Sequence, residues 1–143
     1  MKRDTLKQNI FNRIMINGNK ETSEKLFFKS LKSLQKDLRR KNFEEILRVS
    51  VINSSPTVYM KRIQRKRKRP TEFPFLLKSN ARISYGVKFL IHSSRKNLQN
   101  SFYKILKTEL INSSKKKSFG FKRKTDIHKE VFLKKKFANF RWF

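Results

Sequence analysis

The residues best suited to chemistry in this sequence are cations that stand close together. Residues 61–69 include seven lysines and arginines and no acidic residue. Like charges this dense repel one another unless an anionic partner neutralises them. We favour direct contact with the phosphates of a nucleic acid, because phosphate contacts release condensed counterions. A nuclear-localisation signal is an open alternative, since short basic runs often match such signals by chance.

Side chains for catalysis or metal binding are sparse. The chain has no cysteine, which excludes disulfides, thiolate catalysis and the usual zinc sites. Its two histidines, His92 and His128, lack metal-ligand spacing to a carboxylate cluster. Asp126 lies two residues before His128, so on a helix the two point to different faces, which disfavours a catalytic dyad. We expect a helix cap and a surface or RNA-contacting histidine there, and no enzymatic activity, metal site or cofactor.

The chain as a whole is strongly basic. Its 143 residues include 38 lysines and arginines against 10 aspartates and glutamates, for a formal net charge of +28. A compact domain with this excess requires a polyanion, and nucleic acid is the first candidate. A membrane surface is a weaker candidate, because no stretch approaches the roughly 20 apolar residues of a membrane span. The hydrophobic fraction of 36% predicts a chain that folds.

Apolar spacing predicts a mostly α single domain over residues 1–143, with about six helices and one protruding β-hairpin. The first helix follows Asp4 and stops near Gly18, the second runs from about Glu21 to Arg40, and the third begins after Asn42 and ends before Pro56. The fourth follows Ser79, the fifth follows Asn97, and a basic C-terminal helix occupies about 122–143 with Thr125 or Asp126 as its cap.

The hairpin is predicted over about 57–77. The β-prone runs "TVYM" and "TEFPFLL" flank the basic run, so two strands present the cations at the hairpin tip. Other cations occur on every predicted segment, including a lysine face on the second helix. Readers of duplex DNA usually have a single charged face, whereas charge on many sides suits folded RNA.

The C-terminal "KKKFANFRWF" interleaves cations with aromatic residues. Trp142 lies beyond the periodic part and is a candidate for base stacking or an interface, and Arg141 for a phosphate contact. Phe137 and Phe140 have helical spacing, which favours core positions over stacking.

The order of the motifs resembles the ribosomal protein family S-seven, protein seven of the small subunit. The matching stretches are "FNRIMINGNKETSEKLFFKSL", "SSPTVYMK", "EFP", "KSNARISYGVKFLI" and "FKRKTDIHKEVFLKKKFANFRW", which together cover about Phe11 to Trp142. The chain departs from the family where arginines and lysines replace a glycine pair at the hairpin tip, and where Asn17 replaces an aspartate. The family's basic N-terminal arm is reduced to Lys2 and Arg3.

The resemblance implies a structural protein that binds the 3′ major domain of small-subunit ribosomal RNA and organises the subunit head. It places the hairpin near exit-site transfer RNA and the messenger path, and it implies neighbouring small-subunit proteins as partners, with no membrane contact and no homo-oligomer. A basic DNA-compacting protein is the alternative, which explains the charge but not the ordered motifs. The amino-acid bias typical of AT-rich genomes and the ending directly after Trp142 and Phe143 favour a mitochondrial ribosome, with a plastid or an AT-rich bacterial cytoplasm as alternatives.

The candidate RNA-binding residues share a cationic or stacking side chain near these motifs. They are Lys2, Arg3, Lys20, Lys61, Arg62, Arg65, Lys66, Arg67, Lys68, Arg69, Lys78, Arg82, Arg95, Lys115, Lys116, Lys122, Arg123, Lys135, Arg141 and Trp142.

Overall fold

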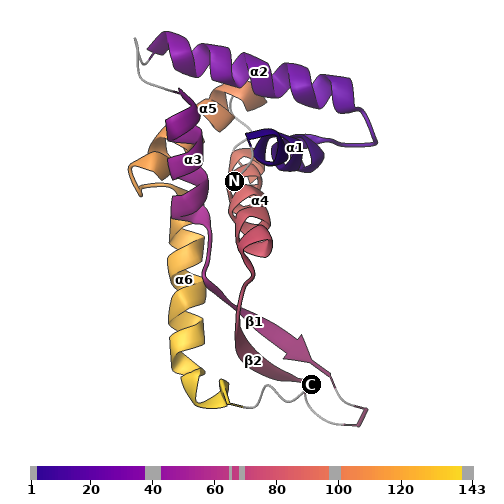
Figure 1. Cartoon of the computed structure of the whole chain (residues 1–143), viewed down its shortest axis with the longest axis vertical. Coiled ribbons are helices and arrows are strands. Elements are labelled where there is room, and N and C mark those ends of the chain that lie inside the picture. Colours follow the sequence, from indigo (N-terminus) through magenta and orange to yellow (C-terminus); the bar gives the residue numbers. More distant parts are fainter. Residues whose placement is uncertain (1–2, 38–42, 65, 68–69, 97–100, 140–143) are drawn as a thin grey trace.

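The structure is a computed structural model that describes residues 3–37, 43–64, 66–67, 70–96 and 101–139. Within these residues the chain forms six α-helices, one two-stranded antiparallel hairpin and a closing 3-10 turn (Figure 1). The elements are α1 (Arg3–Ile14), α2 (Lys20–Asp37), α3 (Phe43–Ser54), β1 (Val58–Ile63), β2 (Thr71–Leu76), α4 (Ser79–Lys96), α5 (Phe102–Ser114), α6 (Phe119–Leu133) and η1 (Lys135–Phe137). The predicted fold class, mostly α with one hairpin, is confirmed.

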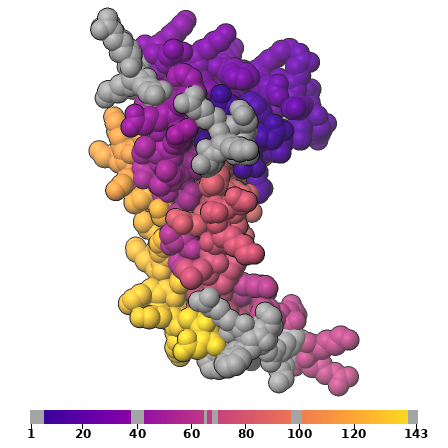
Figure 2. Space-filling model, viewed as in Figure 1, coloured from indigo at the N-terminus to yellow at the C-terminus, as the bar shows by residue number. Residues whose placement is uncertain are grey.

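The molecule is elongated, with a helical body at one end and two projecting elements at the other. Helix α2 lies across the outer end of the body, and α6 and the hairpin extend from the opposite end (Figure 1). In the space-filling view the hairpin projects farthest from the body (Figure 2). The basic hairpin therefore projects away from the helical body and its core.

Helices α1 to α5 share one hydrophobic core. Its members are Leu6, Ile10, Phe11, Ile14, Phe27, Leu31, Leu34, Leu47, Val51, Val87, Leu90, Ile91, Leu106 and Leu110. The most buried of these are Phe27, Leu34 and Val87, each about 1% exposed. No described residue of α6 or of the hairpin belongs to this cluster. Burial of apolar area, worth about 25 cal/mol per Å², therefore stabilises the body and leaves the two projections to other contacts.

Small residues let the helices approach closely where α3 meets α4 and α5. The hydroxyls of Ser54 and Ser113 lie 2.8 Å apart, and Ser113 also donates to the carbonyl of Ser50. At Gly86 in α4, an added Cβ would lie 2.8 Å from the carbonyl oxygen of Val51 in α3. The backbone of α4 thus packs directly on that of α3, which sets the direction in which the hairpin leaves the body.

The structure corrects the predicted start and end of the sixth helix. Helix α6 begins at Phe119 and not after Thr125 or Asp126, because the hydroxyl of Ser118 accepts the Phe121 N–H at 3.0 Å and caps the helix. It ends at Leu133, and a 3-10 turn over Lys135–Phe137 follows. The predicted helix over about 122–143 is therefore wrong at its start and, within the described residues, interrupted after Leu133.

The structure also tests the predicted start of the first and the fifth helix. The first helix already begins at Arg3, so Asp4 lies inside it and does not precede it. The fifth helix begins at Phe102, and Ser101 before it makes no side-chain cap bond. Asn42 and Asn97 lie outside the described residues.

Replacing Gly86 with alanine tests the close approach of α3 and α4. In an open helix this change stabilises by about 1 kcal/mol, because alanine favours the helix over glycine. Here the added methyl meets backbone that cannot move away, and overpacking typically costs about 1–3 kcal/mol. We expect a lower free energy of unfolding in urea titration. The control Lys88→Ala, at an exposed position of the same helix, should change it by less than about 0.5 kcal/mol. A Gly86→Ala protein as stable as the parent would contradict the close packing.

Candidate nucleic-acid interface

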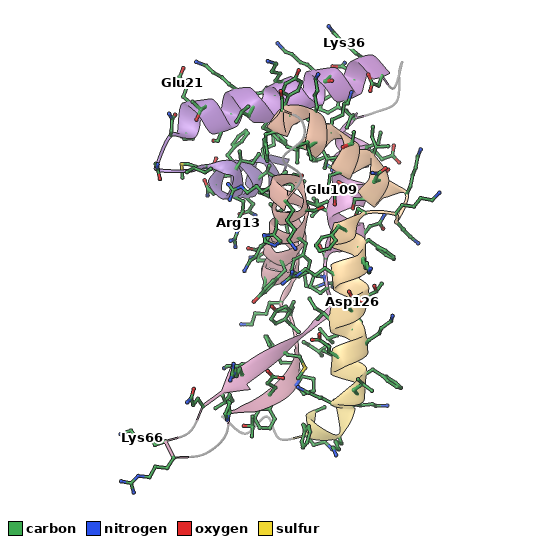
Figure 3. The ribbon with its side chains drawn as sticks, turned by 180° about the vertical axis from the view of Figure 1, so that it is seen from behind. Arg13, Glu21, Lys36, Lys66, Glu109 and Asp126 are labelled. Carbon is green, nitrogen blue, oxygen red and sulfur yellow. The ribbon has the colours of Figure 1, made fainter. Side chains whose placement is uncertain are left out.

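The hairpin presents its cations at the far end of the molecule. Strands β1 and β2 pair in antiparallel register from Val58 opposite Leu76 to Ile63 opposite Thr71. Lys61 and Arg62 are exposed near the end of β1. Beyond them Lys66 and Arg67 are exposed in the connecting turn, and Figure 3 shows Lys66 at the outermost point of the hairpin. The prediction of a structured basic hairpin agrees with this placement.

The turn departs from ordinary backbone conformation at Arg67. Its φ of 61° lies in the left-handed region, which a glycine adopts more readily. Arg67, which is not a glycine, thus holds a backbone conformation at the tip that favours glycine. Arg65, Lys68 and Arg69, which were also predicted to bind RNA, lie outside the described residues.

An ion pair ties the hairpin to the end of α6. Glu72 on β2 lies opposite Arg62 in the strand register and accepts a hydrogen bond from the ammonium of Lys134, the residue after α6. This hydrogen bond, followed by the charges of Lys134 and Arg62, holds the pKa of the Glu72 carboxyl below its ordinary value. Phe73 adds an edge-to-face contact with Phe137 at 6.5 Å between ring centroids. The ion pair and the aromatic contact therefore both help to hold the tip half of the hairpin.

Aromatic rings fix the base of the hairpin on α4. Tyr59 of β1 stacks on Tyr85 at 4.5 Å between centroids, and Tyr85 contacts Phe89 at 6.2 Å. Phe75 of β2 meets Tyr59 edge to face. Stacked aromatic pairs of this kind contribute about 0.5–1.5 kcal/mol beyond area burial. The row of rings connects the hairpin to the body, where the apolar core does not reach.

His128 forms a second link at the hairpin base. Its Nε2 atom accepts a hydrogen bond from the backbone N–H of Thr57 at 3.3 Å, so the ring joins α6 to the entry of β1. Burial, followed by the charge of Lys124, lowers the pKa of His128. Both effects favour the neutral ring, which is the form that can accept this bond. The expected surface histidine is instead a half-buried structural contact.

Lys124 of α6 is influenced by two other cations, Arg82 of α4 and Lys116 in the turn before α6. Lys124 donates to the backbone carbonyl of Asn53 at 3.0 Å, near the end of α3. Its pKa is lowered by burial and then by the charges of Arg82 and Lys116. The charges of two predicted residues from segments far apart in the sequence, Arg82 and Lys116, thus act on the same lysine. Lys124 was not predicted, because its role depends on a carbonyl of another helix and leaves no spacing signal.

A cleft of about 640 Å³ separates the hairpin from one side of α6. Its lining includes Lys122 and Arg123 but also the carboxylates of Glu72, Asp126 and Glu130. Arg123 lies over the ring of Phe89 at 5.7 Å. With three acids and two bases, the cleft itself is no anion pocket. Phosphates therefore fit the outer faces of the hairpin and of α6 better than the space between them.

The remaining predicted residues do not join these groups. Lys78, before α4, is exposed, as are Lys115 before α6 and Lys135 after it. Lys20 pairs with Glu24 at the start of α2, at the other end of the molecule. Lys2, Arg141 and Trp142 lie outside the described residues, as does the side chain of Arg3.

Arg95 has a structural role that the sequence did not indicate. Its guanidinium donates to the backbone carbonyls of Arg13 and Ile14, the last two residues of α1, at 3.1 and 3.0 Å. A cation that binds the orphan carbonyls at a helix C-terminus also complements the helix dipole. Arg95 therefore holds α1 on α4, although its exposure leaves RNA contact as a prediction.

Metal and membrane sites find no support in the described part of the chain. Across it, no group of three or more histidine, aspartate or glutamate residues could hold a metal ion. None of its helices is both long and apolar enough to cross a membrane.

Comparison with known proteins gives a consistent result. The family described as Ribosomal protein S7p/S5e matches residues 1–131. Small ribosomal subunit protein uS7c of Euglena gracilis is 28% identical over 138 residues, which cover 96% of this chain and 87% of that protein. Small ribosomal subunit protein uS7 of Buchnera aphidicola is 27% identical over 133 residues, 93% of this chain and 84% of the relative. The protein of the same name from Xylella fastidiosa is 28% identical over 131 residues, 92% and 83% of the two chains.

The His128 contact predicts a pH-dependent stability. Because the pKa of His128 is lowered on folding, the unfolded chain binds its proton first as the pH falls. The contribution of the His128 contact to the free energy of unfolding is complete above the unfolded pKa of about 6.5 and is lost below it. We expect the free energy of unfolding to fall between about pH 7.5 and 5.5, where carboxylates hardly titrate. His128→Gln should remove most of this fall and His92→Gln should retain it. Equal pH profiles for His128→Gln and the parent would disprove the contact.

The contacts of Arg95 predict that its replacement lowers the stability of the fold. Arg95→Gln removes both bonds to the α1 carbonyls and should lower the free energy of unfolding by about 1 kcal/mol. Arg95→Lys keeps the charge but lacks the planar guanidinium, so its free energy of unfolding should lie between those of the parent and of Arg95→Gln. Calorimetry measures the stability, and a salt titration of RNA affinity shows whether Arg95 also neutralises a phosphate. Unchanged stability with a reduced salt dependence would mean that Arg95 serves RNA and not α1.

Proposed function

Because the chain belongs to the ribosomal protein S7p/S5e family, we propose that its basic hairpin and the junction of α4 with α6 bind the RNA of the small ribosomal subunit. The protein is a structural component of that subunit. The observation that carries the RNA-binding proposal is the exposed pair Lys66 and Arg67 on a hairpin that projects from the body. The alternative of a DNA-compacting protein finds no support in the comparisons.

The proposed mechanism is binding by charge and shape. Cations at the hairpin tip contact phosphates, which fix the position of the protein without reading base sequence. Phosphate contact at a defined place requires that the hairpin keep its direction. The stack of Tyr59 on Tyr85 and the Glu72–Lys134 pair supply this rigidity. RNA helices that approach from several sides would meet cations on the hairpin and at the α4–α6 junction alike.

The family resemblance gives finer expectations. We propose that the bound RNA is the 3′ major domain, that the protein organises the subunit head, and that the hairpin lies near exit-site transfer RNA and the messenger path. We also propose that its partners include other small-subunit proteins and that it acts without catalysis or cofactor. The sparse acid/base inventory of the sequence supports the last point.

The compartment is proposed from the composition of the chain. Lysine, asparagine, isoleucine and phenylalanine are abundant, whereas alanine occurs at Ala81 and Ala138 alone. This bias fits an AT-rich genome, and we propose a mitochondrial ribosome. Mass spectrometry of ribosomes purified from mitochondria, plastids and cytosol of the source organism tests this. Recovery from plastid ribosomes alone would overturn it.

Charge reversal at the hairpin tip tests the RNA-binding surface. Lys66→Glu/Arg67→Glu removes two cations and should weaken binding to a small-subunit 3′-domain transcript. The slope of log affinity against log salt should become shallower by about 0.7–0.9 for each phosphate that the protein no longer neutralises. Lys66→Arg/Arg67→Lys keeps both charges at the same positions and should retain the slope. If the Glu variant kept the slope of the parent, the tip would not lie on the RNA-binding surface.

A further inference from the structure

Helix α2 carries a row of lysines on the side that faces away from the core. Its inward face buries Phe27, Leu31 and Leu34. Lys29, Lys32 and Lys36, here called the α2 lysine row, follow at spacings of three and four residues and are all exposed. At 100° and 1.5 Å per residue they form one stripe about 10 Å long, roughly opposite the buried face. Figure 3 shows Lys36 on the outer side of α2, at the end of the molecule.

The acids of α2 form their ion pairs with lysines outside this row. Glu21 and Glu24 pair with Lys25 and Lys20 in the first turns, and Asp37 pairs with Lys107 of α5. Lys29 lies over the ring of Tyr103 at 4.5 Å, a cation–π contact that attracts the ammonium without an acidic partner. Among the described residues, neither Lys32 nor Lys36 forms an ion pair. Like charges at a spacing of four residues destabilise a helix by a few tenths of a kcal/mol per pair, so the row costs stability unless an anion contacts it.

The row lies at the opposite end of the molecule from the hairpin. Helices α3, α4 and α5 separate α2 from β1 and β2, and Lys36 and Lys66 mark the two ends in Figure 3. An RNA segment that contacts the hairpin tip therefore cannot contact the α2 lysine row without passing along the whole body. The hairpin tip and the α2 lysine row are therefore suited to two different segments of RNA.

We propose that the α2 lysine row binds the phosphate backbone of a second RNA segment, so that the protein bridges two parts of the ribosomal RNA. This rests on the proposed RNA-binding function and adds a second surface to it. Lysine is depleted at protein–protein interfaces, whereas phosphate contact draws on it. A straight row of point charges on a helix can follow a phosphate backbone without reading bases. An RNA backbone is therefore the favoured occupant over a neighbouring protein.

Directed cleavage of RNA tests the proposal, and the absence of cysteine in the chain makes every introduced cysteine unique. Lys32→Cys and Lys66→Cys, each carrying an iron–EDTA tether, are assembled separately with full small-subunit ribosomal RNA. We expect each tether to cleave nucleotides nearby, and the two sets of cuts to fall in different RNA segments. Cuts from Lys66 but none from Lys32 would overturn the bridging proposal and leave the proposed function intact. No cuts from either position would count against both.

Paired charge variants supply a second readout. Lys32→Gln/Lys36→Gln should make the salt slope for small-subunit RNA shallower by about 1.4–1.8, the value expected when two phosphates are no longer neutralised. Lys32→Arg/Lys36→Arg keeps the charges and should keep the slope. The Gln variant removes a like-charge pair, so its unfolding temperature should equal or exceed that of the parent. An unchanged salt slope in the Gln variant would overturn the proposal, as would identical cleavage patterns from the two tethers.

Discussion

The structure depends above all on how a chain of net charge +28 disposes of its like charges. Its ten acids are few, and several of them hold elements together inside the molecule. Glu72 binds Lys134 across the hairpin and α6, and Asp37 binds Lys107 across α2 and α5. The carboxylate of Glu109 accepts the N–H of Gly120 at the start of α6. Most cations are thus left on the surface, where the phosphates of RNA can neutralise them.

The helical body, α1 to α5, is stabilised in a different way from the two elements that project from it, α6 and the hairpin. Helices α1 to α5 bury a common apolar core, which none of the described residues of α6 or the hairpin joins. The projections depend on a few directional contacts, chiefly the stack of Tyr59 on Tyr85 and the bond from Thr57 to His128. Such contacts fix a direction but contribute less stability than a core, so the hairpin is the part most dependent on its surroundings. Bound RNA would supply both the counter-charge and further support for this element.

The sequence predicts most of the fold and part of the interface, and the difference has a physical cause. Apolar spacing identified the helices, since their buried faces repeat with the helical period, and β-prone runs identified the hairpin. The start of α6 was missed because Ser118 caps it within a stretch that looks like a polar loop. The roles of Arg95, Lys124 and Lys134 were missed because each contacts a residue far away in the sequence. Composition shows how much charge there is, but only tertiary structure shows which cations hold the fold.

The central claim is that the arrangement of cations, and not their number alone, selects RNA of a particular shape. The most direct measurement compares affinity for a small-subunit 3′-domain RNA with affinity for random RNA duplex of equal length, from low to physiological salt. Both affinities should fall as salt rises, because phosphate contacts dominate each. The account predicts that the domain RNA keeps a clear advantage at physiological salt. If the two affinities became equal there, charge alone would govern binding, and the account would be wrong.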